Sequence, residues 1–130
     1  MGEEREGWTS FRPCYVNGSA YGGLIGLPGA FMAFAQDLLK PESVLLPSKF
    51  REKMFRENHL NNGKGTGMSL GWYCGQLNGK RFVAHAGGGG GYYCELRIYP
   101  ENGLGSIVMT NRSGFSDERM LNKFDPFFIN

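Results

Sequence analysis

The sequence predicts an α+β fold, in which an antiparallel β-meander sheet packs with helices. Two segments with helical apolar spacing come first, four strand-like runs follow, and another helical segment ends the chain. Short turn signals join the strands, as in a meander, whereas parallel neighbours would need long crossovers. At 130 residues the chain is at most one domain.

Apolar residues at helical spacing predict the first two helices. In residues 29–40 one face carries Phe31, Phe34, Ala35, Leu38 and Leu39. Pro41 stops this helix, because proline disfavours helical backbone in the residue before it. A second helix is predicted over residues 48–58, with Ser48 as its N-cap. Its apolar side carries Phe50, Met54 and Phe55.

Runs rich in β-branched and aromatic residues predict four strands, near residues 68–77, 80–85, 92–99 and 104–111. Asn78-Gly79 is a strong signal for a two-residue hairpin turn, whose backbone needs positive φ. Another turn is marked by Glu101-Asn102-Gly103. A last helix is predicted to open at Ser116 and to end at Asp125-Pro126.

Five consecutive glycines, Gly87–Gly91, follow His85 between two of these strands. A two-residue hairpin needs one or two glycines, whereas five remove every side chain and cost chain entropy on folding. Bare backbone at a strand end lets a ligand approach the N–H groups closely, which indicates a binding site. From glycine content alone, a long flexible hairpin loop is the favoured interpretation.

The histidine lies within a wider pattern. His85-Ala86-Gly87 is preceded by Leu70-Gly71-Trp72 and followed by Glu95–Pro100 and Val108–Asn111, while Tyr21–Gly26 comes before an amphipathic helix. From about residue 21 to 111, this arrangement resembles the beta-lactamase-related serine hydrolases. These penicillin-binding-protein-like enzymes include class C beta-lactamases, D-aminopeptidases and related esterases. The resemblance implies the C-terminal part of a beta-lactamase/transpeptidase-like fold.

That family has three active-site motifs, and this chain carries one of them. Ser-x-x-Lys supplies the nucleophile and a lysine that helps activate it, but no serine here has a lysine three residues later. The third motif is Lys-Thr-Gly or His-x-Gly, and His85-Ala86-Gly87 matches the second form. The resemblance thus implies that His85 faces the substrate's acid or carbonyl group. It makes the N–H of Gly88 one of two oxyanion-hole donors, so the candidate catalytic residues are His85, Gly87 and Gly88.

Two near-matches are rejected. Tyr15-Val16-Asn17 has the form of the family's Tyr-x-Asn motif, but that motif lies far upstream of the Gly-Gly-Leu segment, and Tyr15 is close to it. Lys64-Gly65-Thr66-Gly67 resembles Lys-Thr-Gly with an insertion. Its surroundings have the composition of a connecting loop, and His85 already occupies the expected place.

The composition bears on which partners and cofactors the chain is expected to bind. The net charge is only +2 and the basic residues form no run, so nucleic acid is not predicted as a partner. No apolar stretch reaches the ~18 residues of a membrane-spanning helix. No cofactor is expected, and Cys14, Cys74 and Cys94 lack the spacing of a zinc site. Cys74 and Cys94 are read as small buried hydrophobes, although a pair on neighbouring strands stays open.

These observations predict that residues 1–130 form a single partial domain, the C-terminal portion of a beta-lactamase-like serine hydrolase that is inactive alone. Whether it acts as an enzyme stays open, since a separately encoded front half would complete it for ester or amide substrates. The alternative is a stand-alone binding or oligomerisation module. The exposed strand edges and the Phe-rich tail, Phe124–Ile129, predict self-association or contact with a missing N-terminal half. The compartment is left open.

Overall fold

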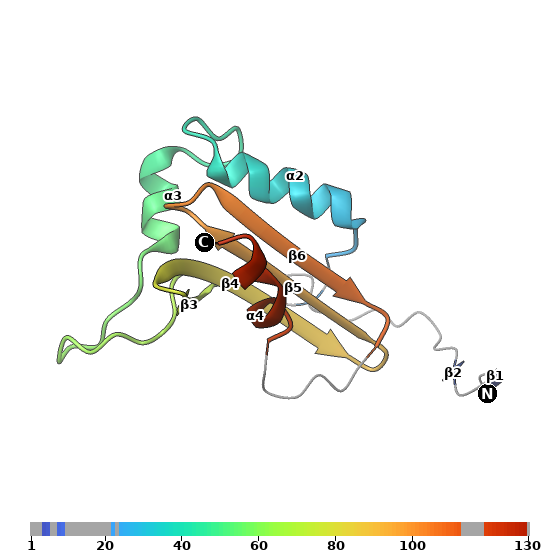
Figure 1. Cartoon of the computed structure of the whole chain (residues 1–130). Coiled ribbons are helices and arrows are strands. Elements are labelled where there is room, and N and C mark those ends of the chain that lie inside the picture. The colour runs from blue at the N-terminus through green and yellow to red at the C-terminus, as the bar shows by residue number, and fades with distance from the viewer. Residues whose placement is uncertain (1–3, 6–7, 10–21, 23, 113–118, 130) are drawn as a thin grey trace.

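The computed structural model describes residues 4–5, 8–9, 22, 24–112 and 119–129. Its body is a four-stranded antiparallel sheet with helices on both faces (Figure 1), which confirms the predicted α+β class. A separate two-stranded pairing near the N-terminus, β1 (Glu4–Arg5) with β2 (Trp8–Thr9), was not predicted from the sequence.

The two long helices form close to where apolar spacing predicts them. Helix α2 spans Pro28–Leu39 and begins with a proline, whose missing N–H costs nothing in the first turn. Helix α3 spans Ser48–Phe55 and therefore ends before the predicted residue 58. The prediction that Ser48 is an N-cap is wrong. Pro47 holds that position in an extended conformation, and no side chain caps the helix.

The apolar faces of these helices are narrower than predicted. Ala35 and Leu38 of α2 and Phe55 of α3 are buried against the sheet. Phe34 and Phe50, which were predicted on the apolar faces of these helices, are exposed instead. Each helix contacts the sheet through one stripe, and a residue one position away from that stripe points to the flank.

Four strands follow in meander order, β3-β4-β5-β6. They are β3 (Tyr73–Leu77), β4 (Lys80–Gly89), β5 (Tyr92–Tyr99) and β6 (Leu104–Thr110). The Asn78-Gly79 turn has positive φ at both residues, as predicted. Strand β3 begins later than predicted, because the chain turns at Gly71 (φ 83°) and leaves Met68 only an isolated bridge to Tyr73.

The pentaglycine is not a long flexible loop, so that interpretation is wrong. Gly87, Gly88 and Gly89 continue β4 and pair with Cys94, Tyr93 and Tyr92 of β5. Only Gly90 and Gly91 form the turn, with positive φ at Gly91. Hydrogen bonds between strands join backbone N–H and C=O groups, so β5 can pair with glycines as it pairs with any other residue.

The sheet has an apolar core on each face. Beneath α2 and α3 the buried residues are Ala35, Leu38, Phe55, Trp72, Val83, Leu96 and Ile98. The C-terminal segment covers a smaller cluster on the other face, made of Phe82, Ala84, Tyr99 and Ile129. Alternation along β4 and β5 sends successive side chains to opposite faces and so supplies both cores.

The C-terminal segment packs as helix α4 (Leu121–Phe124) followed by a 3-10 helix, η1 (Asp125–Phe127). The predicted helix start at Ser116 lies outside the described residues. The predicted end at Asp125-Pro126 is confirmed, because α4 stops at Phe124 with Asp125 as its C-cap. The 3-10 helix then begins, and proline is tolerated in its first turn. Phe124, Phe127 and Phe128 are exposed.

The two described cysteines are both free and half-buried. Cys74 lies on β3 and Cys94 on β5, so β4 separates their strands and they are not on neighbouring strands. Cys74 packs against the core beneath α2 and α3, as expected of a small hydrophobe. Burial, and then the neighbouring Glu95 carboxylate, raise the pKa of Cys94.

Candidate functional site

His85 lies two-thirds of the way along β4, where that strand passes the end of its neighbour β3. It pairs with Leu96 of β5, and its side chain is exposed. Its ring lies 6.0 Å from that of Tyr73, measured between centroids. Tyr73 is the first residue of β3 and was not singled out from the sequence.

The outer edge of β4 is open beyond this point. Strand β3 pairs with β4 only from Lys80 to Ala84. Among the described residues, no strand pairs with the outer edge of the stretch from His85 to Gly89. The last part of β4 is therefore held by β5 on one side and presents backbone on the other.

The register fixes which backbone groups face the open edge. A two-residue turn makes Gly89 and Tyr92 a hydrogen-bonded pair, and alternation then directs the N–H groups of Gly87 and His85 toward β5. Ala86 and Gly88 hold the intervening positions. Their N–H and C=O groups therefore point away from β5, toward the open edge.

The glycines also leave space beside His85. Gly87 is two residues along β4 from His85 and shares its face of the sheet. A Cβ atom added at Gly87 would meet nothing within 4 Å, whereas one at Gly89 would lie 2.6 Å from the ring of Tyr92. The open volume is thus next to His85, while the ring of Tyr92 closes the end of the strand.

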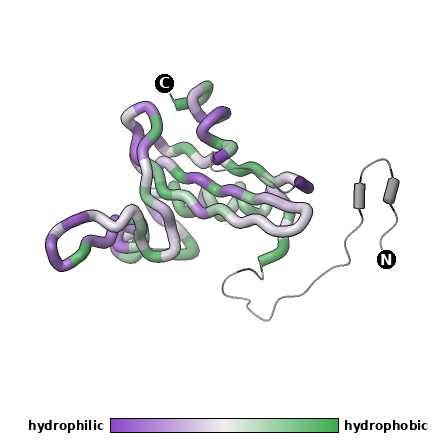
Figure 2. Tube along the Cα trace, turned by 90° about the horizontal axis from the view of Figure 1, so that it is seen from below, coloured by the Kyte–Doolittle hydropathy of each residue, from purple (hydrophilic) through white to green (hydrophobic). Residues whose placement is uncertain are grey.

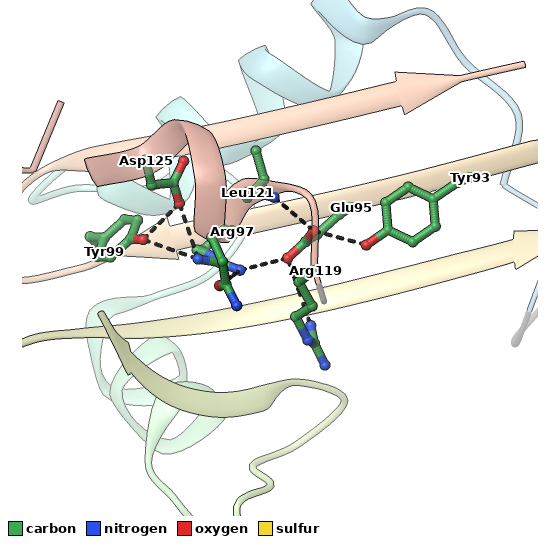
Figure 3. A network of polar contacts seen from close by, with 8 residues as sticks. Tyr93, Glu95, Arg97, Tyr99, Arg119, Leu121 and Asp125 are labelled. Carbon is green, nitrogen blue, oxygen red and sulfur yellow. Dashed lines mark hydrogen bonds and ion pairs between the residues drawn. The ribbon is translucent and has the colours of Figure 1, made fainter. Parts of the chain in front are cut away.

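A buried polar network lies beneath this strand end, on the face covered by α4 and η1 (Figure 3). Tyr93 sits opposite Gly88, and Glu95 sits opposite Ala86. The Tyr93 hydroxyl donates to Oε2 of Glu95 at 2.8 Å. Glu95 is fully buried, and its Oε1 lies 2.8 Å from a guanidinium nitrogen of Arg97.

Arg97 is the centre of the network and is also fully buried. It donates to Oδ1 of Asn122 at 2.9 Å and forms an ion pair with Asp125 at 3.3 Å. Its guanidinium lies 4.1 Å from the ring centroid of Phe82. Two buried carboxylates thus face Arg97, and Arg119 adds a second positive charge 3.9 Å from Glu95, so the charges balance.

The same arginine links the network to the candidate site. The Arg119 guanidinium lies 4.3 Å over the ring of Tyr73, whose other neighbour is His85. A chain of contacts therefore runs from the buried Glu95 through Arg119 and Tyr73 to His85. No sequence pattern predicts this series of contacts, because Arg119 is far from the strands in sequence. The C-terminal segment brings it next to them in the fold.

Burial and hydrogen bonding shift two tyrosines in the network. Burial first, and then the hydrogen bond to Glu95, raise the pKa of Tyr93 to about 12. Burial likewise raises the pKa of Tyr99 to about 12; the hydrogen bond from Arg97 lowers it, and the one to Asp125 raises it. Both tyrosines are therefore neutral hydrogen-bond donors at ordinary pH.

The remaining sequence candidates lie elsewhere. Tyr15 is outside the described residues. Lys64–Gly67 belongs to an exposed loop between α3 and β3 that projects from the body, where hydrophilic residues predominate (Figure 2). The loop composition read from the sequence is therefore confirmed. Ser43, one of the serines without a lysine three residues later, donates its hydroxyl hydrogen to Asp37 at 2.5 Å. This bond, together with those from the N–H groups of Leu45 and Val44, lowers the pKa of Asp37.

The described part of the chain contains neither a candidate metal site nor a candidate membrane-spanning helix. No group of three or more His, Cys, Asp or Glu side chains there is arranged to hold a metal ion. No helix among the described residues is long and apolar enough to cross a bilayer.

The described residues form an α+β fold in which helices flank an antiparallel sheet. Over residues 1–125 the chain matches the protein-family model described as Beta-lactamase. It therefore belongs to the beta-lactamase family, and the match begins earlier and ends later than the resemblance noticed in the sequence. No curated protein and no solved structure matches the chain.

Proposed function

We propose that this chain is the C-terminal portion of a beta-lactamase-like serine hydrolase and holds one wall of the active site without the nucleophile. In this proposal His85 and Gly87 form the third motif, and the N–H of Gly88 is one oxyanion-hole donor. The small-molecule ester or amide substrate would bind only when a second chain supplies the rest of the active site, including the nucleophile.

The observation that carries the proposal is the outward N–H of Gly88 at an open strand edge beside the exposed His85. An oxyanion donor must be fixed before the reaction, and a strand held by its neighbour provides that rigidity. Such a donor is worth roughly 3 kcal/mol of transition-state stabilisation. The family role of Gly88 requires an N–H directed out of the sheet, and the register provides one.

The absent nucleophile argues that the chain alone does not catalyse acyl transfer. A serine hydroxyl is a weak nucleophile until a neighbouring base activates it. No serine in the chain has a lysine at the spacing that the family uses. A partner chain carrying Ser-x-x-Lys would therefore be needed for activity.

Hydrolysis assays test this proposal. The isolated chain and its His85→Ala variant should hydrolyse nitrocefin and p-nitrophenyl acetate at the same background rate. A turnover that the His85→Ala change abolishes would contradict it, because it would mean that the chain has a complete site.

A second candidate, a stand-alone binding or oligomerisation module, is favoured by exposed apolar surface. Leu24, Ile25 and Leu27 are each more than 70% exposed around the start of α2, where Figure 2 shows a hydrophobic segment. Phe127 and Phe128 are exposed at the other end of the chain. Apolar surface of this kind favours association.

Light scattering at micromolar concentration tests this second candidate. More than one chain per particle, with dissociation on Leu24→Ser and Ile25→Ser substitution, is the expected result. A monomer that unfolds cooperatively at every concentration would rule out an oligomerisation module, and it would leave the first proposal intact.

A further inference from the structure

A concave site lies on the same face of the sheet as His85 but toward the other end of β4. It is a groove of about 400 Å³ between the end of α2, α3 and the start of β4. Arg81 lines it from the second residue of β4, whereas Gly88 lies seven positions further along that strand. At a rise of ~3.3 Å per residue, the backbone of Arg81 is roughly 13 Å from that of His85 and roughly 23 Å from that of Gly88. The groove is therefore independent of the proposed function.

The floor of the groove is apolar. Leu38 of α2 and Phe55 of α3 line it and are nearly fully buried, and the half-buried Leu39 extends it. The volume falls within the range of small-molecule sites, which are typically apolar with a few convergent polar groups. An alkyl or aryl group would be desolvated on this floor.

Three arginines and one carboxylate line the rim. Arg51 is already engaged, because its guanidinium donates to the backbone carbonyls of Lys40 and Pro41 at the end of α2. Arg56 and Arg81 take part in no ion pair or side-chain hydrogen bond with any described residue. Among the described residues that line the groove, Glu52 is the only acidic one.

We propose that this groove binds a small amphiphilic carboxylate, with its apolar body on Leu38 and Phe55 and its carboxylate held by Arg56 and Arg81. Three guanidinium groups against one carboxylate leave a local excess of positive charge, which selects an anion. The planar guanidinium fork matches a carboxylate geometrically and forms short charge-assisted hydrogen bonds with it. The floor adds affinity only for a ligand that also carries an apolar group.

Binding measured by NMR or calorimetry on the full chain tests the ligand class. Octanoate should bind roughly tenfold more tightly than either acetate, which lacks the tail, or 1-octanol, which lacks the charge. The backbone amides of α3 and the first residues of β4 should shift on octanoate addition. Equal affinity for octanoate and 1-octanol, or shifts confined to other segments, would overturn the proposal.

Variants that change the charge of the groove give a second test, because they should change octanoate affinity in opposite directions. The double change Arg56→Gln with Arg81→Gln should weaken octanoate binding at least about fivefold, since both anion partners are lost. Glu52→Gln should tighten it, because the competing carboxylate is removed. The double change Arg112→Gln with Lys64→Gln, which removes the same two positive charges from exposed residues outside the groove, should leave it unchanged. Equal effects of the Arg112 and the groove variants would mean that only overall charge matters, and would overturn the site.

Discussion

The hydroxyl of Tyr99 donates a 2.6 Å hydrogen bond to Oδ2 of Asp125 and so joins β5 to the 3-10 helix at the C-terminal end. Both residues are nearly fully buried, and the same carboxylate oxygen lies 3.3 Å from Arg97. The C-terminal segment is therefore held on the sheet by this buried hydrogen bond and ion pair (Figure 3) as well as by the apolar contacts of Ile129.

Loss of the charge at Asp125 should destabilise the fold more than loss of the hydrogen bond. Asp125→Asn leaves the buried Arg97 with one carboxylate partner fewer, and breaking a buried pair costs about 3–5 kcal/mol. Tyr99→Phe removes one buried hydrogen bond and should cost about 1–3 kcal/mol. Urea unfolding followed by circular dichroism compares them, with the exposed Glu101→Gln as control. A smaller loss of unfolding free energy in Asp125→Asn than in Tyr99→Phe would contradict the proposed weight of the Arg97–Asp125 ion pair.

Alkaline pH should weaken the same region. The folded-state pKa values of Tyr93 and Tyr99 are raised to about 12, above the ordinary tyrosine value near 10. A raised pKa contributes stability that is complete below the unfolded-state pKa and is lost as pH rises through the folded-state pKa. The free energy of unfolding should therefore fall between about pH 10 and 12.

The matched variants for this pH dependence are Tyr93→Phe and Tyr99→Phe, with the exposed Tyr92→Phe as control. The fall in stability should become shallower in the first two and stay unchanged in the third. An equally steep fall in all three variants would show that the buried hydroxyls do not cause it.

Two glycines should respond in opposite ways to the same substitution. A Cβ atom at Gly75 would lie 2.5 Å from Cζ of the buried Phe82, whereas at Gly87 it would meet nothing within 4 Å. Gly75→Ala should lower the free energy of unfolding by about 1–3 kcal/mol through overpacking. Gly87→Ala should change it by less than about 0.5 kcal/mol. Thermal melts of both variants decide the point, and similar melting temperatures would contradict the packing around Phe82.

The strands and long helices were predictable because their signals are local. Apolar spacing places α2 within one residue of its observed bounds, and the Asn78-Gly79 turn has the backbone that its sequence requires. The pentaglycine was misread because glycine content reports intrinsic freedom, whereas the conformation of Gly87–Gly89 is set by the β5 ladder.

The polar network could not be predicted from the sequence. The alternation of Glu95, Arg97 and Tyr99 with apolar residues is typical of a strand with one face in solvent. Here the C-terminal segment covers that face and supplies Asn122 and Asp125 as partners. The pairing joins residues 25 or more positions apart, and no local pattern reports such a contact.

Anion binding at the open edge of β4 should report the backbone register. On titration with acetate or sulfate, the amides of Ala86 and Gly88 should shift, because their N–H groups point out of the sheet and unpaired donors accept anions. The amides of Gly87 and Gly89, which bond to β5, should shift least and serve as an internal control. Equal shifts across all four amides, or none, would contradict the role proposed for Gly88.

Intact-mass analysis after incubation with a serine-directed fluorophosphonate tests the central claim most directly, because it detects an activated serine whatever the substrate. The proposal that the chain holds one wall of a beta-lactamase-like site but no nucleophile predicts an unmodified mass. The same mass should be found with and without denaturation before the incubation. Stoichiometric addition of one phosphonyl group to a serine of the folded chain, lost on denaturation, would contradict it.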